Sequence, residues 1–372
     1  MILMALNIGI IGVGTIGNLH LHSLKQINNE NLLSDNDINI KVRGVADVDP
    51  KKLHSLKQNS MYDIEYFTMD PNEIIKDKEI DIIYITSPTR FHKDHFIQAA
   101  EEGKNIFCEK PLAFFLKDIR EMISSEKKHG VFVHVGLVLR HCPVFWKVKQ
   151  LLLNNRNNFG KRLLFIFRNT QEWPISSKTH PSEWRKEPSL AHAGCLFEHS
   201  IHDIDLLEYF FAEKSHLAQL YAKIRYVSPL TQNRLEDVVN LKFDYEDGFL
   251  GNLFSIWNKT QLDERNLEIF FENGYLGLDG YNIFSFRKFE YLIGREKKKF
   301  KYNEITDEYL KAYNYPKLYA QTGPYLFENL HFLKSIINEV KPYPGLEIGY
   351  RAHEIIDLAY QSSRENRILS FI

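Results

Sequence analysis

The sequence predicts an α/β protein with two domains: an N-terminal doubly wound Rossmann domain over residues 1–136, and a C-terminal α+β domain over residues 137–372 with a large, mainly antiparallel, open-faced sheet. A glycine-rich turn, Gly12–Gly17, follows a short apolar strand at the start of the chain. Up to residue 136, apolar β-branched runs alternate with amphipathic helices, which is typical of parallel βαβ units. Beyond it, longer strand-like runs are separated by turns such as Glu246-Asp247-Gly248, which indicate antiparallel hairpins.

The N-terminal elements follow from short apolar runs with Gly, Pro or Asp at their ends. A polar segment, Asn28–Asn39, is expected to be a loop insertion between the first helix and the second strand. The expected strands are Ile8–Gly12, Val42–Ala46, Ile80–Thr86, Asn105–Cys108 and Val131–Val135. The expected helices between them are Thr15–Ile27, Pro50–Leu56, Phe91–Glu102 and Leu116–His129.

In the C-terminal part, Pro143–Leu153 is expected to be a helix that links the domains. Helices near Leu196–Phe211 and Tyr325–Val340 are expected to cover one face of the sheet, and Arg351–Arg364 to pack back on the body. The other face meets solvent or another subunit, and its aromatic and β-branched residues favour a subunit contact. The expected strands are Leu163–Arg168, Leu217–Val227, Val238–Tyr245, Phe249–Trp257, Leu267–Phe271 and Tyr281–Phe286.

Composition excludes several classes of protein. The 372 residues are 44% hydrophobic and 26% charged, with a net charge of -1, so neither nucleic acid nor an anionic membrane is an expected partner. The basic segment Arg295–Lys301 is expected to be a solvated turn or edge strand. Cys108, Cys142 and Cys195 lack CxxC spacing, which favours free thiols in a reducing compartment. With no signal-peptide pattern and no apolar run near the ~18 residues of a membrane span, we expect a cytoplasmic protein.

The turn after the first strand has the pattern of a dinucleotide site, formed by Gly12, Val13, Gly14, Thr15, Ile16 and Gly17. The first glycine permits the turn, Gly14 lets the backbone approach a pyrophosphate, and Gly17 allows close helix–strand packing. The following helix start offers free N–H donors to phosphates. The alternative is a glycine-rich turn without a ligand.

Asp47 ends the second strand, where a carboxylate can accept hydrogen bonds from both ribose hydroxyls and repel a 2′-phosphate. The sequence therefore favours NAD over NADP as cofactor. Lys51 and Lys52 keep NADP possible, because either ammonium could reach a 2′-phosphate.

Lys110 follows the strand over Asn105–Cys108, within Glu109-Lys110-Pro111. Because ligands bind at the carboxyl ends of parallel strands, its ammonium is expected beside the nicotinamide and the reacting carbon. There a neighbouring cation and partial burial would favour proton transfer. The alternative is a surface lysine in an ordinary turn.

A second constellation lies in Gly194–Asp205. If this segment is one helix, Glu198 and His202 are four residues apart and share a face, which suits a general base oriented by a carboxylate. His192, His199 and His202 raise zinc as an alternative, but HExxH is absent and we expect no metal. A purely structural helix is the other alternative.

Taken in order along the chain, these motifs resemble the Gfo/Idh/MocA family of oxidoreductases (glucose–fructose oxidoreductase and inositol dehydrogenase) over essentially the whole length. The matching segments are Gly12–Gly17, Ala46–Pro50, Thr86-Ser87-Pro88 with His92, Glu109-Lys110-Pro111, Arg140 with Pro143, Trp184-Arg185, Gly194–Asp205 and Gly349–Glu354.

The resemblance implies that Lys110 and His202 are the catalytic pair, with Glu198 where relatives more often carry Asp. His199 stands where many relatives have a small residue. The family's sheet implies a homodimer or homotetramer. The resemblance further assigns cofactor contacts to Thr86, Ser87, Pro88, His92, Glu109, Lys110 and Arg140, and substrate contacts to Lys110, Trp184, Arg185, Glu198 and His202.

We therefore expect an NAD(P)-dependent oxidoreductase that acts on a secondary alcohol or ketone of a sugar, cyclitol, amino sugar or sugar nucleotide. His202 would take the hydroxyl proton, Lys110 would stabilise the developing alkoxide, and Glu198 would orient His202 or a neighbouring hydroxyl. Two alternatives remain: an NAD-dependent glycosidase that oxidises its substrate transiently, and a non-catalytic dinucleotide-dependent regulatory protein. Such a regulatory protein would be expected to lack the Lys or the His.

Overall fold

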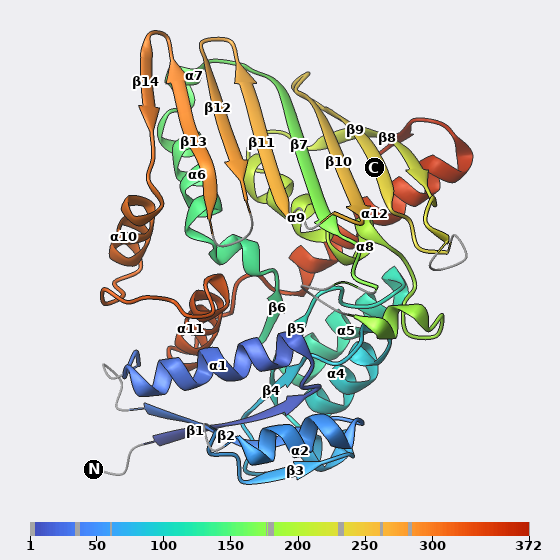
Figure 1. Ribbon diagram of the computed structural model, residues 1–372, viewed down its shortest axis with the longest axis vertical. Coiled ribbons are helices and arrows are strands. Elements are labelled where there is room, and N and C mark those ends of the chain that lie inside the picture. The colour runs from blue at the N-terminus through green and yellow to red at the C-terminus, as the bar shows by residue number, and fades with distance from the viewer. Residues whose placement is uncertain are drawn as a thin grey trace. The chain divides into compact units, whose positions relative to one another are not determined.

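A computed structural model describes residues 4–33, 38–59, 62–175, 177, 182–229, 234–260, 263–281 and 285–371. The chain divides into two units (Figure 1). Unit 1 comprises Met1–Val138 and Leu318–Tyr350, and unit 2 comprises Leu139–Lys317 and Arg351–Ile372. A later segment of the chain, Leu318–Tyr350, therefore belongs to the N-terminal unit. The predicted single boundary after residue 136 does not include this segment.

Unit 1 contains a six-stranded parallel sheet in the order β3-β2-β1-β4-β5-β6. This order reverses direction next to β1, so the predicted doubly wound fold is confirmed. Its strands are β1 (Met4–Ile11), β2 (Ile38–Ala46), β3 (Tyr66–Thr68), β4 (Ile82–Ile85), β5 (Asn105–Glu109) and β6 (Val133–Gly136).

The helices of unit 1 begin and end where local chemistry favours it. Asp49 accepts a hydrogen bond from the Lys51 amide and Pro50 occupies the first turn of α2. Gly130 ends α5 with a φ of 68°, a conformation that favours glycine. The helices are α1 (Thr15–Asn29), α2 (Pro50–Gln58), α3 (Pro71–Lys76), α4 (His92–Glu101), α5 (Leu116–His129) and α11 (Pro324–Ile337), with a 3₁₀ turn over Thr89–Phe91.

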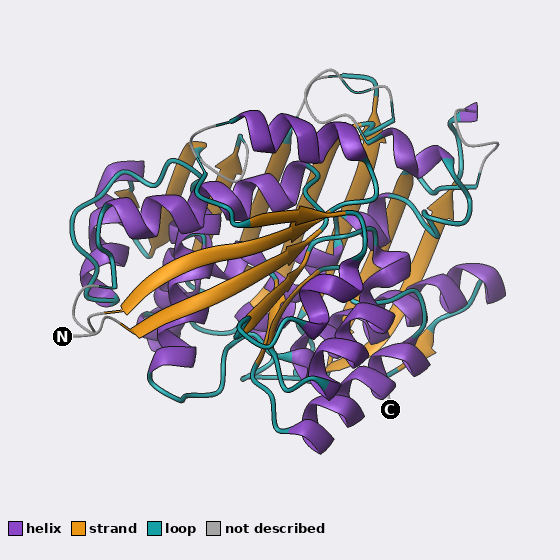
Figure 2. Cartoon of the chain, turned by 90° about the horizontal axis from the view of Figure 1, so that it is seen from below, coloured by secondary structure: helices purple, strands orange, loops and turns teal. Residues whose placement is uncertain are grey.

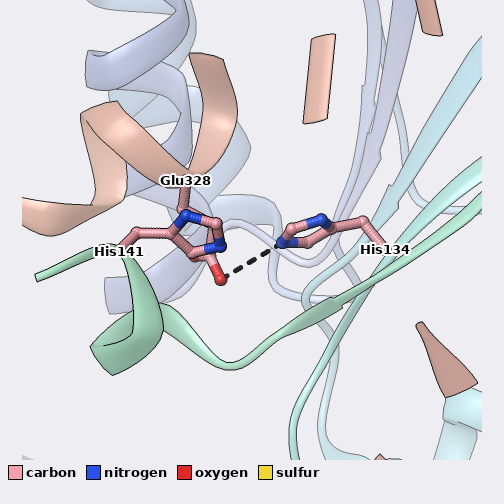
Figure 3. A group of neighbouring side chains, drawn as sticks. All are labelled: His134, His141 and Glu328. Carbon is pink, nitrogen blue, oxygen red and sulfur yellow. Dashed lines mark hydrogen bonds and ion pairs between the residues drawn. The ribbon is translucent and has the colours of Figure 1, made fainter. Parts of the chain in front are cut away.

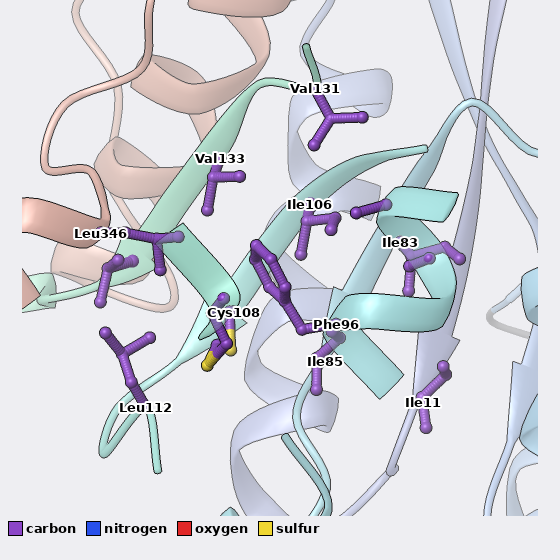
Figure 4. Packing of buried hydrophobic residues seen from close by; sticks show 14 of the residues in the cluster. Ile11, Ile83, Ile85, Phe96, Ile106, Cys108, Leu112, Val131, Val133 and Leu346 are labelled. Carbon is purple, nitrogen blue, oxygen red and sulfur yellow. The ribbon is translucent and has the colours of Figure 1, made fainter. Parts of the chain in front are cut away.

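The core of unit 1 is made by side chains of the strands and of the helices and connecting segments that pack on them (Figure 4). Ile83 and Ile85 of β4 and Ile106 of β5 are fully buried, and Phe96 of α4 packs among them. A strand that is buried on both faces must be apolar at successive positions, which is why these runs do not alternate. The resulting rigid sheet fixes where its strands end, and the candidate site residues lie at those ends.

Helix α11 packs on α1, and polar contacts connect α1 with the segment that leads into α11. Ser23 Oγ lies 2.6 Å from Thr322 Oγ1, and Gln26 Nε2 donates to the Tyr319 carbonyl at 2.7 Å. The prediction that Tyr325–Val340 covers the antiparallel sheet is therefore wrong. The apolar face of this helix predicts that one side of it is buried. It does not predict which sheet or helix packs against that side.

Unit 2 contains a nine-stranded sheet in the order β14-β13-β12-β11-β7-β10-β9-β8-β15. Every neighbouring pair is antiparallel except β10 and β7, so the sheet is mixed. Its strands are β7 (Arg162–Glu172), β8 (Leu217–Arg225), β9 (Val238–Tyr245), β10 (Leu250–Asn258), β11 (Glu264–Phe271), β12 (Gly274–Gly280), β13 (Phe286–Ile293), β14 (Glu296–Lys299) and β15 (Leu369–Ser370).

The sequence misplaced part of this sheet. A strand was expected over Tyr281–Phe286, but residues 282–284 lie outside the described residues and β13 begins only at Phe286. Strands β12 and β13 were not foreseen as separate strands. Glu296–Lys299 is fully exposed at the sheet edge, so the interpretation of the basic segment as a turn or edge strand is confirmed.

Helices cover one face of this sheet (Figure 2). Residues of β10 alternate between buried and partly exposed positions, as expected for a sheet with one covered face. The boundary between the units falls inside α12, after Tyr350. The helices are α6 (Pro143–Asn154), α7 (Arg156–Phe159), α8 (Cys195–Glu198), α9 (Ile201–Phe211), α10 (Tyr302–Ala312) and α12 (Leu346–Glu365), with 3₁₀ turns over Val138–His141 and Glu183–Lys186.

The three cysteines are buried free thiols, and burial raises the pKa of each. In the described part of the chain, no helix combines the length and the apolar character needed to cross a membrane. A cytoplasmic location remains a prediction.

Candidate active site

The glycine turn has the close contacts that its sequence predicts. Gly12 has a φ of 96°, and a Cβ there would lie 2.6 Å from the Ser87 amide nitrogen. A Cβ on Gly17 would lie 2.1 Å from the Gly12 carbonyl oxygen, whereas a Cβ on Gly14 would have no atom within 4 Å. Gly12 and Gly17 are therefore required by packing, and Gly14 faces open space where a ligand could approach.

The N-terminus of α1 can receive an anion. Gly14 is the N-cap and supplies no side chain, and the first turn holds no acidic residue. The amides of Thr15, Ile16 and Gly17 precede the first i→i−4 bond of this helix, which Asn18 donates to the Gly14 carbonyl at 3.0 Å. These donors and the positive end of the helix dipole suit a phosphate.

Asp47 ties this turn to the end of β2. Its Oδ2 accepts the Val13 amide and its Oδ1 accepts the Asp49 amide, both at 2.9 Å. The ammonium of Lys52 lies 3.3 Å from Oδ2, and Asp47 is 8% exposed. The carboxylate is thus fixed in orientation beside the glycine turn, with a cation next to it.

Thr86, Ser87 and Pro88 follow β4, the neighbour of β1. Thr86 Oγ1 donates to the Gly12 carbonyl and lies 3.2 Å from the Ile11 carbonyl. Ser87 Oγ lies 3.3 Å from His95 Nδ1, and Pro88 precedes the 3₁₀ turn that leads into α4. The segment after β4 therefore packs against the glycine turn and is hydrogen-bonded to it.

Lys110 is half-buried directly after β5, and its backbone N–H donates to Glu109 Oε2 at 3.1 Å. Glu109 Oε1 in turn lies 3.1 Å from His20 Nε2, and a Cβ on Gly136 would be 2.6 Å from the Glu109 carboxyl carbon. Glu109, predicted to contact the cofactor, is 6% exposed and bound to the protein's own groups.

Behind Glu109 lies a buried polar network that the sequence did not reveal. His20 Nδ1 lies 3.0 Å from Asn329 Nδ2, which also donates to the Tyr325 carbonyl at 2.7 Å. His134 Nε2 lies 3.4 Å from Glu328 Oε1 (Figure 3). Burial lowers the pKa of His134 well below its ordinary value, so its ring is neutral at physiological pH.

This network contains a set of groups that metals use, although no metal was expected. The ligand atoms of His20, Glu109 and Glu328 all lie within 4.8 Å of one another. A histidine and two carboxylates can also share protons without an ion, and the hydrogen bonds described above connect two of them.

In unit 2, the predicted helix through Gly194–Asp205 is broken, which corrects the predicted i,i+4 geometry. Helix α8 ends at Glu198 and α9 begins at Ile201. Glu198 is 2% exposed, and its Oε2 accepts from Arg185 Nη2 at 2.7 Å. The Arg185 guanidinium lies 4.2 Å from the centre of the Trp184 ring. Trp184, Arg185 and Glu198, which were all predicted to contact the substrate, therefore lie next to one another. The helix face that Glu198 was predicted to share with His202 is not formed.

His202 lies near the start of α9 and is 7% exposed. Residues on both sides of it are anchored in the protein. Ser200 Oγ donates to Ser255 Oγ at 2.7 Å, and Asp203 accepts from Arg265 Nε at 2.8 Å and from Asn169 Nδ2 at 2.6 Å. These bonds attach α9 to the covered face of the sheet and limit the positions open to the imidazole.

Arg140, expected to contact the cofactor, belongs to unit 2 and forms an ion pair with Asp205. Its Nε and Nη2 donate to the Asp205 carboxylate at 2.8 and 2.7 Å, and its guanidinium lies 4.9 Å from the centre of the Tyr209 ring. Burial raises the pKa of Asp205, and the Arg140 charge opposes that rise.

Glu236 fixes the start of α8, and nothing in the local sequence pattern pointed to it. Its Oε2 accepts the Gly194 amide at 2.6 Å, and its Oε1 accepts the Leu196 amide at 3.0 Å and the Tyr360 hydroxyl at 2.8 Å. Burial raises the pKa of Glu236, while these three hydrogen bonds favour the ionised form.

His199, between α8 and α9, receives a hydrogen bond at its Nδ1 from the Trp257 indole at 2.6 Å. An indole N–H can only donate, so Nδ1 is unprotonated and the ring is neutral with its proton on Nε2. The structure thus assigns His199 a fixed tautomer.

Unit 1 has a parallel sheet with a glycine turn, an acid at the end of β2 and a lysine after β5, and unit 2 has a mixed sheet with a buried His and Glu. This combination is typical of two-domain dinucleotide-binding proteins. Residues 6–137 match the profile of an oxidoreductase family with an NAD-binding Rossmann fold, Gfo/Idh/MocA. Residues 145–277 match the C-terminal domain of the same family. The chain belongs to the Gfo/Idh/MocA family.

Curated relatives match part of the chain. An uncharacterized oxidoreductase, YrbE, of Bacillus subtilis is 32% identical over 215 residues, which cover 58% of this chain and 56% of that protein. Myo-inositol 2-dehydrogenase of Thermotoga maritima is 29% identical over 56% of each chain. The chain thus spans little more than half the length of these relatives.

Solved structures match almost the whole chain in fold. Levoglucosan dehydrogenase in complex with NADH has a TM-score of 0.81 and 21% identity over 99% of each chain. An oxidoreductase domain protein from Kribbella flavida has a TM-score of 0.82 and 16% identity, over 99% of this chain and all of that one. At these identities the similarity establishes the fold.

Proposed function

We propose that the protein is an NAD-dependent dehydrogenase that transfers a hydride between the cofactor and a secondary alcohol of a sugar or cyclitol. The observation that carries this proposal is the position of Lys110. It follows β5, which lies next to β4, and β4 lies next to β1, the strand that leads into the glycine turn. Ligands of open parallel sheets bind at these carboxyl ends. The sugar or cyclitol class is supported by the named inositol and levoglucosan dehydrogenases among the relatives.

In this proposal the chain's residues prepare the alcohol for oxidation. His202 accepts the hydroxyl proton, and the Lys110 ammonium stabilises the developing negative charge on the same oxygen. Glu198 and Arg185 form a fixed pair that binds a neighbouring substrate hydroxyl, with Trp184 beside it. Bound NAD supplies the hydride acceptor at its nicotinamide ring.

We infer that NAD is preferred over NADP because Asp47 Oδ1 and Oδ2 are already oriented by two backbone amides. A carboxylate held at the end of β2 repels a 2′-phosphate. Lys52 reduces this repulsion, since its ammonium lies 3.3 Å from the carboxylate. NADP is therefore expected to bind more weakly and not to be excluded.

Replacing Lys110 by Met tests the proposal. Loss of the ammonium should lower kcat with NAD and the preferred polyol by a factor of about 10² to 10⁴, the range for one acid–base or oxyanion group. The substrate is first found by screening sugars, inositols and sugar nucleotides with NAD and following absorbance of the reduced cofactor. Lys117→Met, at an exposed position in the same unit, is the matched control.

Turnover of the Lys110→Met protein within about threefold of the wild type would contradict the catalytic assignment. Release of a sugar with no net NADH would instead identify a glycosidase. No turnover on any polyol with NAD or NADP, although the dinucleotide binds, would favour a regulatory protein.

We further propose that the uncovered sheet face of unit 2 forms a homo-oligomer contact. Leu164 of β7 pairs with Leu250 of β10 and Phe270 of β11, so these three side chains lie in a row on one face, and none is buried. Leu250→Asp should then lower the molar mass measured by light scattering in solution. An unchanged mass, or a monomeric wild type, would exclude this interface.

A further inference from the structure

His92 lies at the first position of α4, is 1% exposed, and has a carbonyl oxygen at each ring nitrogen. Nδ1 lies 2.8 Å from the Pro111 carbonyl, and Nε2 lies 2.6 Å from the Ser87 carbonyl. Both partners are backbone atoms of the segments that follow neighbouring strands, Ser87 after β4 and Pro111 after β5.

This burial argues against the role that the family resemblance suggested for His92. A side chain with 1% exposure has almost no surface left to offer a dinucleotide. Its two ring nitrogens face the protein's own carbonyl groups at hydrogen-bond distance. Its contacts are therefore made with the backbone next to the site.

The chemistry of the two partners favours a doubly protonated ring. A carbonyl oxygen only accepts hydrogen bonds, so both ring nitrogens can donate only in the imidazolium form. A neutral ring would leave a lone pair facing one of the oxygens. His95, one turn further along α4, is neutral, because burial lowers its pKa to about 4, with the charge of His92 as a second cause.

The Pro111 carbonyl belongs to the residue directly after Lys110. On the other side, the Lys110 N–H is held by Glu109 Oε2 at 3.1 Å, and Glu109 is held by His20. The backbone of Lys110 is thus constrained from both sides. The same histidine also holds Ser87, whose amide nitrogen lies against the glycine turn.

We propose that His92 is a positioning residue: as an imidazolium, it joins the segments after β4 and β5 and thereby holds Lys110 in its reactive position. This inference rests on the proposed role of Lys110 in hydride transfer. It differs from a cofactor contact because it predicts an effect on turnover without a matching effect on dinucleotide affinity.

Substitutions of His92 separate the two hydrogen bonds. His92→Phe removes both, His92→Asn can keep a donor near the position of Nδ1, and His92→Gln can keep one near the position of Nε2. We expect kcat to fall at least about 10-fold in His92→Phe, as expected when a catalytic group is misplaced, and the Kd for NADH to stay within about threefold. We expect His92→Asn to recover more turnover than His92→Gln, because the Asn amide replaces the link to Pro111. His95→Phe is the control on the same helix.

Two measurements do not depend on activity. The ¹⁵N shifts of the His92 ring in wild-type protein at pH 7 should be those of an imidazolium. Hydrogen exchange at the amides of Lys110 and of residues 112–115 should quicken in His92→Phe relative to His95→Phe. Both results are expected even if the protein oxidises no polyol. The positioning role of His92 can therefore be tested separately from the proposed function.

Neutral-ring ¹⁵N shifts at pH 7 would overturn the imidazolium assignment. An increase in the Kd for NADH as large as the loss of kcat/KM would show a cofactor contact. Unchanged exchange at Lys110 and residues 112–115 together with unchanged kcat would show that His92 does not position Lys110.

Discussion

At the scale of single residues, Asp47 shows how one carboxylate can serve both fold and ligand. It accepts two backbone amides, one from the glycine turn and one from the start of α2. In the proposed complex with NAD, both bonds would orient its oxygens before the ribose binds. Preorganised acceptors need no rearrangement on binding, which lowers the cost of association.

Asp47→Asn should therefore raise the Kd for NAD by about 10-fold or more, because the amide group places a donor opposite one of two N–H donors and the charge is lost. Isothermal titration with NAD and with NADP measures both affinities. We expect the preference for NAD over NADP to shrink at the same time. Asp49→Asn is the control, since asparagine is an equally good helix cap. An unchanged Kd for NAD would remove Asp47 from the cofactor site.

Part of the residue-level geometry could be predicted because it depends on local chemistry. Gly12 needs a positive φ and Lys110 follows a strand, and both features are visible in the sequence. His20 could not be found in this way. Its partners Glu109 and Asn329 are 89 and 309 positions away, and a histidine inside an amphipathic helix gives no local sign of such contacts.

At the scale of elements, the break between α8 and α9 changes how the second half of the site is understood. One continuous helix would have supported Glu198 and His202 by its own backbone. Instead each short helix is anchored separately, α8 by Glu236 and α9 by Asp203. Helix propensity does not reveal such a break, because tertiary hydrogen bonds compensate for the lost helical ones.

Glu236→Gln should destabilise the fold by about 1–3 kcal/mol, because the amide NH₂ must take the place of one carboxylate oxygen. It then faces either the Gly194 N–H or the Leu196 N–H and Tyr360 hydroxyl, and cannot accept a hydrogen bond from them. Chemical denaturation followed by tryptophan fluorescence measures this change, since all four tryptophans lie in unit 2. Turnover should fall as well, as Glu198 loses its support. Glu246→Gln, at an exposed turn, should change neither; equal stability of the two variants would contradict the anchoring role.

The partner of α11 was the other error at this scale. Apolar residues predicted the helix and its buried side correctly, but two sheets were available to receive it. Polar residues that contact α1, such as Thr322 just before α11, favour α1 as the partner of this helix. They form no periodic pattern by which the sequence could reveal that contact.

At the scale of the whole molecule, buried and half-buried histidines make unit 1 sensitive to acid. Burial lowers the pKa of His95 and of His331 to about 4, and it lowers the pKa of His134 well below its ordinary value. In the unfolded chain these groups take up a proton near pH 6.5. Below that pH the unfolded state binds more protons than the folded state, so stability is complete above pH 6.5 and is lost as the pH falls towards 4.

Lowering the pH from 7.5 to 5 should therefore lower the protection factors of the unit 1 peptides, that is, raise their exchange rates after correction for the slower intrinsic exchange at pH 5. His331→Gln removes one of these groups and should reduce the pH dependence by up to about 2 kcal/mol over this range. Hydrogen exchange with mass spectrometry reports on each unit separately, and His216→Gln, at an exposed position in unit 2, is the control. An equally steep pH dependence in the His331 variant would contradict this linkage.

The return of residues 318–350 to unit 1 has a consequence for synthesis on the ribosome. His20, Ser23 and Gln26 emerge early, while their partners around Thr322 and Asn329 lie up to 309 positions later. At ordinary translation rates this delay is roughly 15 to 60 s. During that time one side of the nascent nucleotide-binding half stays uncovered, so a chaperone has its longest opportunity to bind at α1.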